Sequence, residues 1–175
     1  YGRASNASIN YTKTTAISLS GAAHSYWQDF LPSHNISSWH DRSSLTPITY
    51  LGYPICASVA QHTFAFNKIL NTIQHACHIH SQRHLSLRGK ATVLNSLILS
   101  KLWHVMRLFS FTQHQLTQLR STCSSFINHH IFPKLSFATL TLPRHQGGLC
   151  LLDPIKQYRC LQWKWLHPLL RHSSS

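Results

Sequence analysis

The sequence predicts an α+β fold that is mostly α-helical, with an N-terminal two-stranded antiparallel β-ribbon followed by a helical bundle. Residues 9–19 and 48–55 mix β-branched and aromatic side chains in the way typical of strands. From residue 64 onward, apolar residues recur every three or four positions, which indicates helices with one apolar face. Hydrophobic residues make up 43% of the 175 residues, enough for a core. No run of about 18 apolar residues is present, so no membrane span is expected.

The predicted ribbon is built from two short runs. Residues 9–19, INYTKTTAISL, form the first expected strand, with Lys13 at its start. The polar residues 20–46 are expected to connect the strands, with short pieces of order. Residues 48–55, ITYLGYPI, form the second expected strand, in which Gly52 suggests a bulge or a bend at a sheet edge. We expect the two strands to pair antiparallel.

Residues 85–109 form the central predicted helix. Ser86 is the expected N-cap. Lys90 and Lys101 are almost three whole turns apart, so a regular helix would point them the same way. The spacing has two interpretations: a core helix with a solvated outer surface, or one whose open flank lies against a polyanion. The apolar stripe comprises Leu87, Ala91, Leu94, Ile98, Leu102, Val105 and Phe109.

Three further helices are expected. The first covers 64–80 and the second 113–130, both from apolar spacing. The last begins at Pro154 with Asp153 as its cap, because proline suits the first turn of a helix. Pro168 should end or kink this helix. Its apolar side is predicted to comprise Leu161, Trp165 and Leu169.

The charge balance is the strongest functional signal in the composition. There are 16 Lys and Arg against three Asp and no Glu, which gives a formal charge of +13, and the 15 His add to it below about pH 6.5. Such a chain repels itself unless an anion is near. Phosphate backbone is the first expected counter-charge and anionic membrane the second. The five scattered Cys read as reduced thiols of an intracellular protein, without a CxxC pair.

Four short segments, in order along the chain, resemble the reverse transcriptase of LINE-type, non-LTR retrotransposons. ASNASINYTKT (4–14) is similar to the segment that follows the catalytic acid pair in that family. TYLGYPI (49–55) resembles the primer-grip hairpin, and RHLSLRGKATVLNSLILSKLWHVMRL (83–108) resembles the thumb helix. GGLCLLDP (147–154) resembles the block after the thumb, with Cys150 where a glycine is usual.

The resemblance implies three regions and a specific set of partners. Residues 1–56 would be the end of the polymerase palm with the primer-grip-like hairpin, 57–131 the helical thumb, and 132–175 a post-thumb linker and C-terminal helix. The partners would be an RNA/DNA template–primer and the rest of the reverse transcriptase polyprotein, with no membrane. The location would be intracellular and nuclear.

The resemblance also implies that chemistry needs residues this sequence lacks. A polymerase of this kind holds two metal ions on adjacent carboxylates, and the three Asp stand far apart. The acid pair would precede Tyr1, which fits a chain that opens without Met as a processed product or a piece of something longer. We therefore expect an RNA-directed DNA polymerase fragment that is inactive alone. No cofactor is expected in this chain, and Mg²⁺ only in the complete polymerase.

The resemblance assigns roles to individual residues. Lys13 would assist catalysis by stabilising charge on the departing pyrophosphate, unless it is a solvated lysine at a strand end. The primer-grip residues, which would otherwise be plain strand packing, are Tyr50, Leu51, Gly52 and Tyr53. The residues expected at the phosphates of the duplex, or alternatively on a solvated helix face, are Arg83, Arg88, Gly89, Lys90, Lys101 and Arg107.

Other interpretations of these motifs stay open. Trp103 is expected in the core rather than as a stacking platform for bases. The run CHIHSQRH invites a zinc site on Cys77, His80 and His84, but structural zinc takes four ligands at tight spacing, so no metal site is expected. Two functional alternatives are a stand-alone basic nucleic-acid-binding module and a decayed relic that no longer folds well.

Overall fold

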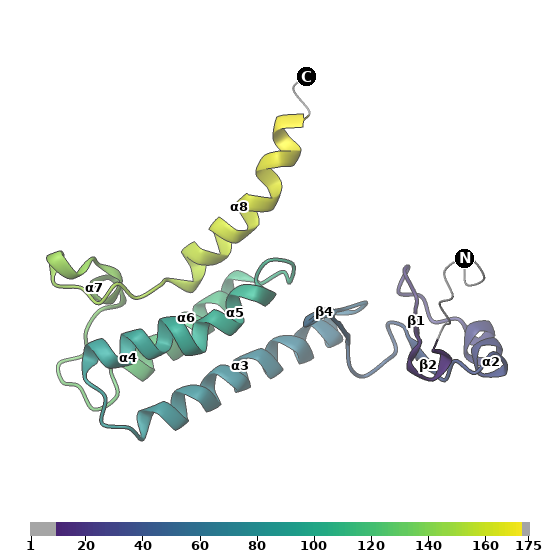
Figure 1. Ribbon diagram of the computed structural model, residues 1–175, viewed down its shortest axis with the longest axis horizontal. Coiled ribbons are helices and arrows are strands. Elements are labelled where there is room, and N and C mark those ends of the chain that lie inside the picture. Colours follow the sequence, from purple (N-terminus) through teal and green to yellow (C-terminus); the bar gives the residue numbers. More distant parts are fainter. Residues whose placement is uncertain (1–9, 173–175) are drawn as a thin grey trace. The chain divides into compact units, whose positions relative to one another are not determined.

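The computed structural model describes residues 10–172, apart from the side chains of Thr12, Trp165, Leu169, Arg171 and His172. It divides the chain into two compact units, Tyr1–Ala65 (unit 1) and Phe66–Ser175 (unit 2), and each is described by itself (Figure 1). Helices dominate and two small two-stranded sheets accompany them, so the expected α+β, mostly α class is confirmed. No described helix is long and apolar enough to cross a membrane.

Unit 1 contains a small parallel sheet and a hairpin. Its elements are η1 (Tyr11–Lys13), β1 (Thr15–Ile17), α2 (Ser25–Ser33), β2 (Ser38–His40), β3 (Ile48–Tyr50) and β4 (Tyr53–Ile55). Strands β1 and β2 pair parallel, with Ala16 opposite Trp39. Parallel neighbours need a crossover, and α2 supplies it inside the segment expected to be a connection.

The expected antiparallel pairing of 9–19 with 48–55 is wrong. The first run contributes only β1, which pairs with β2, while the second run folds back on itself as the β3–β4 hairpin. The reason lies at the tip of the hairpin, where Leu51 has φ 49° and Gly52 has φ 84°. Two consecutive residues with positive φ make the tight turn that matches the twist of a hairpin. The chain therefore reverses inside a run that the composition presents as one strand.

Unit 2 is a helical bundle with a short irregular segment. Its elements are α3 (Val59–Ser81), whose first residues belong to unit 1, α4 (Leu87–Val93), the π-helical turn η2 (Leu94–Ile98), α5 (Leu99–Val105), α6 (Gln113–Ile127), α7 (Phe137–Thr141), η3 (Arg144–Gln146) and α8 (Pro154–His172). Figure 1 shows α4 and α5 as one nearly continuous rod beside α6. The expected helices over 64–80 and 113–130 are therefore present, with shifted ends.

The central helix begins where its cap predicts. The Ser86 hydroxyl accepts a hydrogen bond from the Gly89 backbone N–H at 3.2 Å, so Ser86 is the N-cap. The rod is interrupted by η2, which holds one extra residue per turn compared with an α-helix. The downstream part is thereby rotated by roughly one residue, about 100°. Phe109, expected on this helix, lies in the turn that follows α5.

The apolar stripe of the central helix forms the core of unit 2. Leu94, Leu99 and Met106 are fully buried, as are Leu119 and Ile127 of α6, the helix against which α4 packs. Of the seven predicted stripe residues, Leu87 and Val105 are half-buried and the others are buried. The apolar stripe stays mostly buried on both sides of η2, because burial of apolar side chains stabilises the bundle even when their orientation is rotated. Leu99 and Met106, which the spacing did not include, complete the core.

The last helix also starts at its predicted cap. An oxygen of the Asp153 carboxylate accepts from the Ile155 N–H at 3.0 Å, and Pro154 is the first residue of α8. Pro168 does not end the helix, which continues to His172. Leu161 is half-buried, while the Trp165 and Leu169 side chains lie outside the described residues.

Candidate nucleic-acid interface

Exposed cationic side chains lie along the central helix of unit 2 and at its two ends. Arg83 lies in the loop before α4, Arg88 on α4 and Lys101 on α5, and Arg107 follows α5; all four side chains are exposed. None of the four forms an ion pair with a carboxylate within residues 10–172. Because unpaired, solvated cations retain their charge for a ligand, these side chains are available to phosphates.

Lys90 differs from the other cations because its side chain is buried, with 8% of its surface exposed. Its Nζ donates to the His129 carbonyl oxygen at 2.8 Å and to the Ile127 carbonyl oxygen at 3.4 Å. These carbonyls belong to the C-terminal end of α6, where helix carbonyls lack partners within the helix. Desolvation by burial lowers the pKa of Lys90 below its usual range.

The expectation that Lys90 and Lys101 point the same way is therefore wrong. Lys101 is exposed, whereas Lys90 reaches into the bundle. The rotation introduced by η2 separates the two directions, and spacing alone gives no sign of it. Lys90 therefore does not share an open face with Lys101.

Gly89 is not demanded by the fold. A β-carbon at this position would lie 3.4 Å from the Ser86 hydroxyl oxygen and 3.6 Å from Leu85 Cβ, which are ordinary contact distances. Its backbone is helical, so no unusual conformation requires glycine either. An alanine would favour the helix more strongly. The packing of the fold thus does not explain why position 89 is glycine, and a glycine here leaves room for close approach of a ligand.

The hairpin residues lie at the tip of a two-stranded sheet. Tyr50 and Tyr53 are opposite each other, and Leu51 and Gly52 form the turn between them. Tyr50 is 64% exposed and Leu51 74% exposed, while Tyr53 is half-buried. Apolar and aromatic surface at this tip thus faces solvent, as stacking or sugar contact would need. Trp103, on α5, is half-buried rather than fully enclosed.

Lys13 ends the short 3₁₀ turn η1 rather than opening a strand. The side-chain oxygen of Asn10 accepts from the Lys13 backbone N–H at 3.2 Å, and the side chain of Lys13 is exposed. Strand β1 starts two residues later, at Thr15. The ammonium group is therefore solvated in the described part of unit 1.

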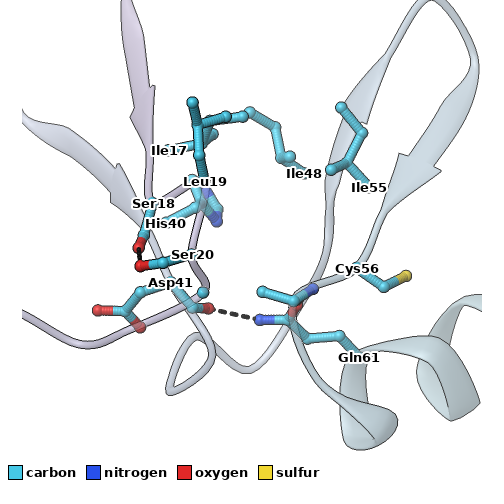
Figure 2. A pocket seen from close by; sticks show the side chains of 12 residues that line it. Ile17, Ser18, Leu19, Ser20, His40, Asp41, Ile48, Ile55, Cys56 and Gln61 are labelled. Atoms are coloured by element: carbon cyan, nitrogen blue, oxygen red, sulfur yellow. Dashed lines mark hydrogen bonds between the residues drawn. The ribbon is translucent and has the colours of Figure 1, made fainter.

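Unit 1 holds a pocket of about 320 Å³ near the ends of both sheets (Figure 2). Ile17, Leu19, Ile48 and Ile55 form its apolar lining, and Ser18, Ser20, His40 and Gln61 are among its polar lining residues. The Gln61 side-chain amide donates to the Asp41 carbonyl oxygen at 2.7 Å, which fixes one wall. The His40 Nδ1 atom is buried without a hydrogen-bond partner.

Asp41 stabilises this corner of unit 1. Its carboxylate accepts from the Ser43 hydroxyl at 2.6 Å, the Ser43 N–H at 2.8 Å and the Trp39 indole N–H at 2.9 Å. The hydrogen bonds from Ser43 and Trp39 lower the pKa of Asp41 to about 2. The carboxylate is thus committed to donors within unit 1.

The metal-like run at the end of α3 has no cluster in the structure. Among the described residues, no group of three or more His, Cys, Asp or Glu side chains is placed to hold a metal ion. Cys77 is buried in the bundle, and burial raises the pKa of its thiol to about 11. The five cysteines form no disulfide.

Comparison with known proteins finds no matching family model, no matching curated protein and no matching solved structure.

Proposed function

We propose that this chain is part of a non-LTR retrotransposon reverse transcriptase, one that binds the template–primer duplex through the basic side of its central helix and is not catalytic alone. The observation that carries the proposal is the set of exposed, unpaired cations Arg83, Arg88, Lys101 and Arg107 around α4 and α5. Contacts from such side chains to phosphates are independent of sequence and set the register of a duplex.

The scarcity of acids supports a polyanionic partner. The chain has three acidic residues against 16 Lys and Arg. Asp41 accepts three hydrogen bonds from its neighbours, and Asp153 caps α8, so two of the three carboxylates already have local roles. The positive charge of unit 2 therefore has little internal compensation, and phosphate groups are the ligand that provides it.

A backbone detail supports the family resemblance itself. Cys150 occupies the position where the resembled block usually has glycine, and its φ is +54°. This left-handed region favours glycine because a β-carbon there is strained. The fold at this position thus suits the glycine of the resembled block, although the sequence carries cysteine.

The test is a binding titration with a fluorescein-labelled RNA/DNA hybrid, read as anisotropy at several salt concentrations. The triple variant Arg88→Ala/Lys101→Ala/Arg107→Ala removes three proposed phosphate contacts. The matched control, Lys156→Ala/Arg159→Ala/Lys164→Ala, removes three exposed cations of α8. Both variants lower the net charge equally, so their difference reports location and not total charge.

We expect the first variant to reduce the slope of log affinity against log salt by about 2 to 3, since each phosphate contact contributes nearly one unit. The control should change the slope by less than one. Equal losses would favour a stand-alone basic module that binds through charge alone, and an unfolded chain in circular dichroism would favour the decayed relic. Primer extension by the chain with Mg²⁺ would contradict the claim that it is not catalytic alone.

A further inference from the structure

A second basic feature of unit 2 is a pocket of about 250 Å³ that the sequence did not indicate. It lies where the end of α3, the loop before α4 and the end of α6 meet. The lining residues that carry or acquire positive charge are Arg83, His84, Lys90, His129 and His130, and no carboxylate lines it. Through Ser81 and His129 the pocket adjoins a groove between α3 and α6.

Lys90 gives the pocket a fixed donor. An ammonium group has three N–H donors, and two of them point to the Ile127 and His129 carbonyl oxygens. The third remains for a ligand. Because the side chain is buried and held at two points, its charge is screened by water less than that of a surface lysine.

The two histidines are held close together after α6. Their ring centroids are 3.8 Å apart, and His130 has φ +61°, a conformation that few residue types adopt readily. The titratable groups that act on His129 are all basic: His130 beside it, Lys90 from α4 and His78 from α3. Desolvation and these basic neighbours lower the pKa of His129, although its side chain is exposed.

We propose that this pocket binds a phosphate-sized oxyanion, either free phosphate or the terminal phosphate of a phosphomonoester, and that its affinity rises as the histidines become protonated. A dianion offers several acceptor oxygens to a pocket whose charged groups are all donors. The site goes beyond the duplex contact proposed above: it shares Arg83 with that contact, but Lys90 and the histidines of the pocket do not belong to the proposed duplex set.

Sulfate is the first probe, since it keeps two charges between pH 5.5 and 8 while phosphate titrates in that range. Calorimetric titration of the folded chain should show saturable binding that weakens at least about tenfold from pH 5.5 to pH 8. At pH 6.5, titrations in two buffers with different ionisation enthalpies should reveal proton uptake on binding. Inorganic phosphate and phenyl phosphate, compared at pH 8, then distinguish the free anion from a monoester.

The double variant His129→Gln/His130→Asn removes two of the three histidines that line the pocket and leaves His84, and asparagine tolerates the positive φ at position 130. The control His114→Gln/His145→Asn changes two exposed histidines outside the pocket. We expect the first variant to lose most of the pH dependence and of the proton uptake, and the control to keep both in full. Arg83→Gln, at an exposed loop position, should weaken sulfate binding several-fold without unfolding the chain.

Binding that does not saturate, that ignores pH, or that is equally affected by both double variants would overturn the proposal. Loss of duplex binding with retained sulfate binding would contradict the proposed function alone, and the reverse would contradict only the oxyanion site.

Discussion

Lys90 provides the sharpest test of how the bundle is stabilised. Replacing it with methionine keeps the length and apolar stem of the side chain but leaves two carbonyl oxygens at the end of α6 without their donor. A hydrogen bond from a charged donor contributes about 1.5–3 kcal/mol net, and the 3.4 Å contact to Ile127 is the weaker of the two. Methionine also removes the cost of burying an ammonium group. We therefore expect Lys90→Met to lower the free energy of unfolding by roughly 1–3 kcal/mol.

The assay is urea unfolding followed by far-UV circular dichroism. The midpoint should fall by on the order of 1 M with an unchanged slope. The control Lys101→Met changes an exposed lysine and should shift stability by less than about 0.5 kcal/mol. A Lys90→Met chain as stable as the Lys101→Met chain would refute the structural role of Lys90.

The pKa of Lys90 adds a second readout to the same comparison. Because burial lowers this pKa, the folded state releases the proton before the unfolded state as pH rises. The stability of the unsubstituted chain should therefore increase, relative to that of Lys90→Met, as pH rises from the lowered pKa toward the ordinary lysine pKa of 10.5. A constant difference between the two chains across that range would contradict the desolvation argument.

Three further predictions concern other parts of the fold. The pKa of Asp41 is about 2 instead of 3.8, so the stability that the Asp41 carboxylate gives unit 1 should be complete above about pH 4 and lost as pH falls toward 2. Tryptophan fluorescence should report this acid transition, and Asp41→Asn should remove it. An acid transition unchanged in Asp41→Asn would contradict the role of this carboxylate. Gly148→Ala should destabilise unit 2 by several kcal/mol, because the new β-carbon would collide with the Leu142 backbone and lie 2.6 Å from the Leu142 Cβ. The alanine of Gly147→Ala meets open space, so that variant should lose only about 1 kcal/mol, for the positive φ at this position. Urea midpoints in the reverse order would refute this comparison. Cys150→Gly should raise the free energy of unfolding by up to about 1 kcal/mol, because glycine relieves the backbone strain at φ +54°. Thermal unfolding measures the effect, and a lower midpoint for Cys150→Gly would contradict the strain.

Local signals in the sequence predict the helix starts well. Ser86 and Asp153 act as caps because their side chains accept from backbone N–H groups two or three residues ahead, an interaction set within a single turn. The apolar stripe is likewise a local periodicity, and it becomes the buried side of the central helix. These features depend little on the rest of the chain, so spacing and residue type are enough.

The errors arise where distant segments decide the outcome. Strand β1 pairs with β2, which lies in a segment too polar to read as a strand. The direction of Lys90 depends on η2 and on carbonyl oxygens nearly forty residues away in the sequence. The pocket around His129 was missed for the same reason, since its residues come from two distant stretches of the chain, 81–90 and 129–131. No pattern within one element carries this information.

A contact through Asn95 links two segments of unit 2 that the sequence separates widely. Asn95, in η2, donates from its side-chain amide to the Cys150 carbonyl oxygen at 3.0 Å and accepts from the Leu152 N–H at 3.0 Å. This pair of bonds joins the thumb-like segment 83–108 to the block 147–154, which are far apart in the sequence. Neither segment is held independently of the other. The two segments instead form one structural piece, and the π-helical turn that misaligns Lys90 and Lys101 is also the turn that contains Asn95.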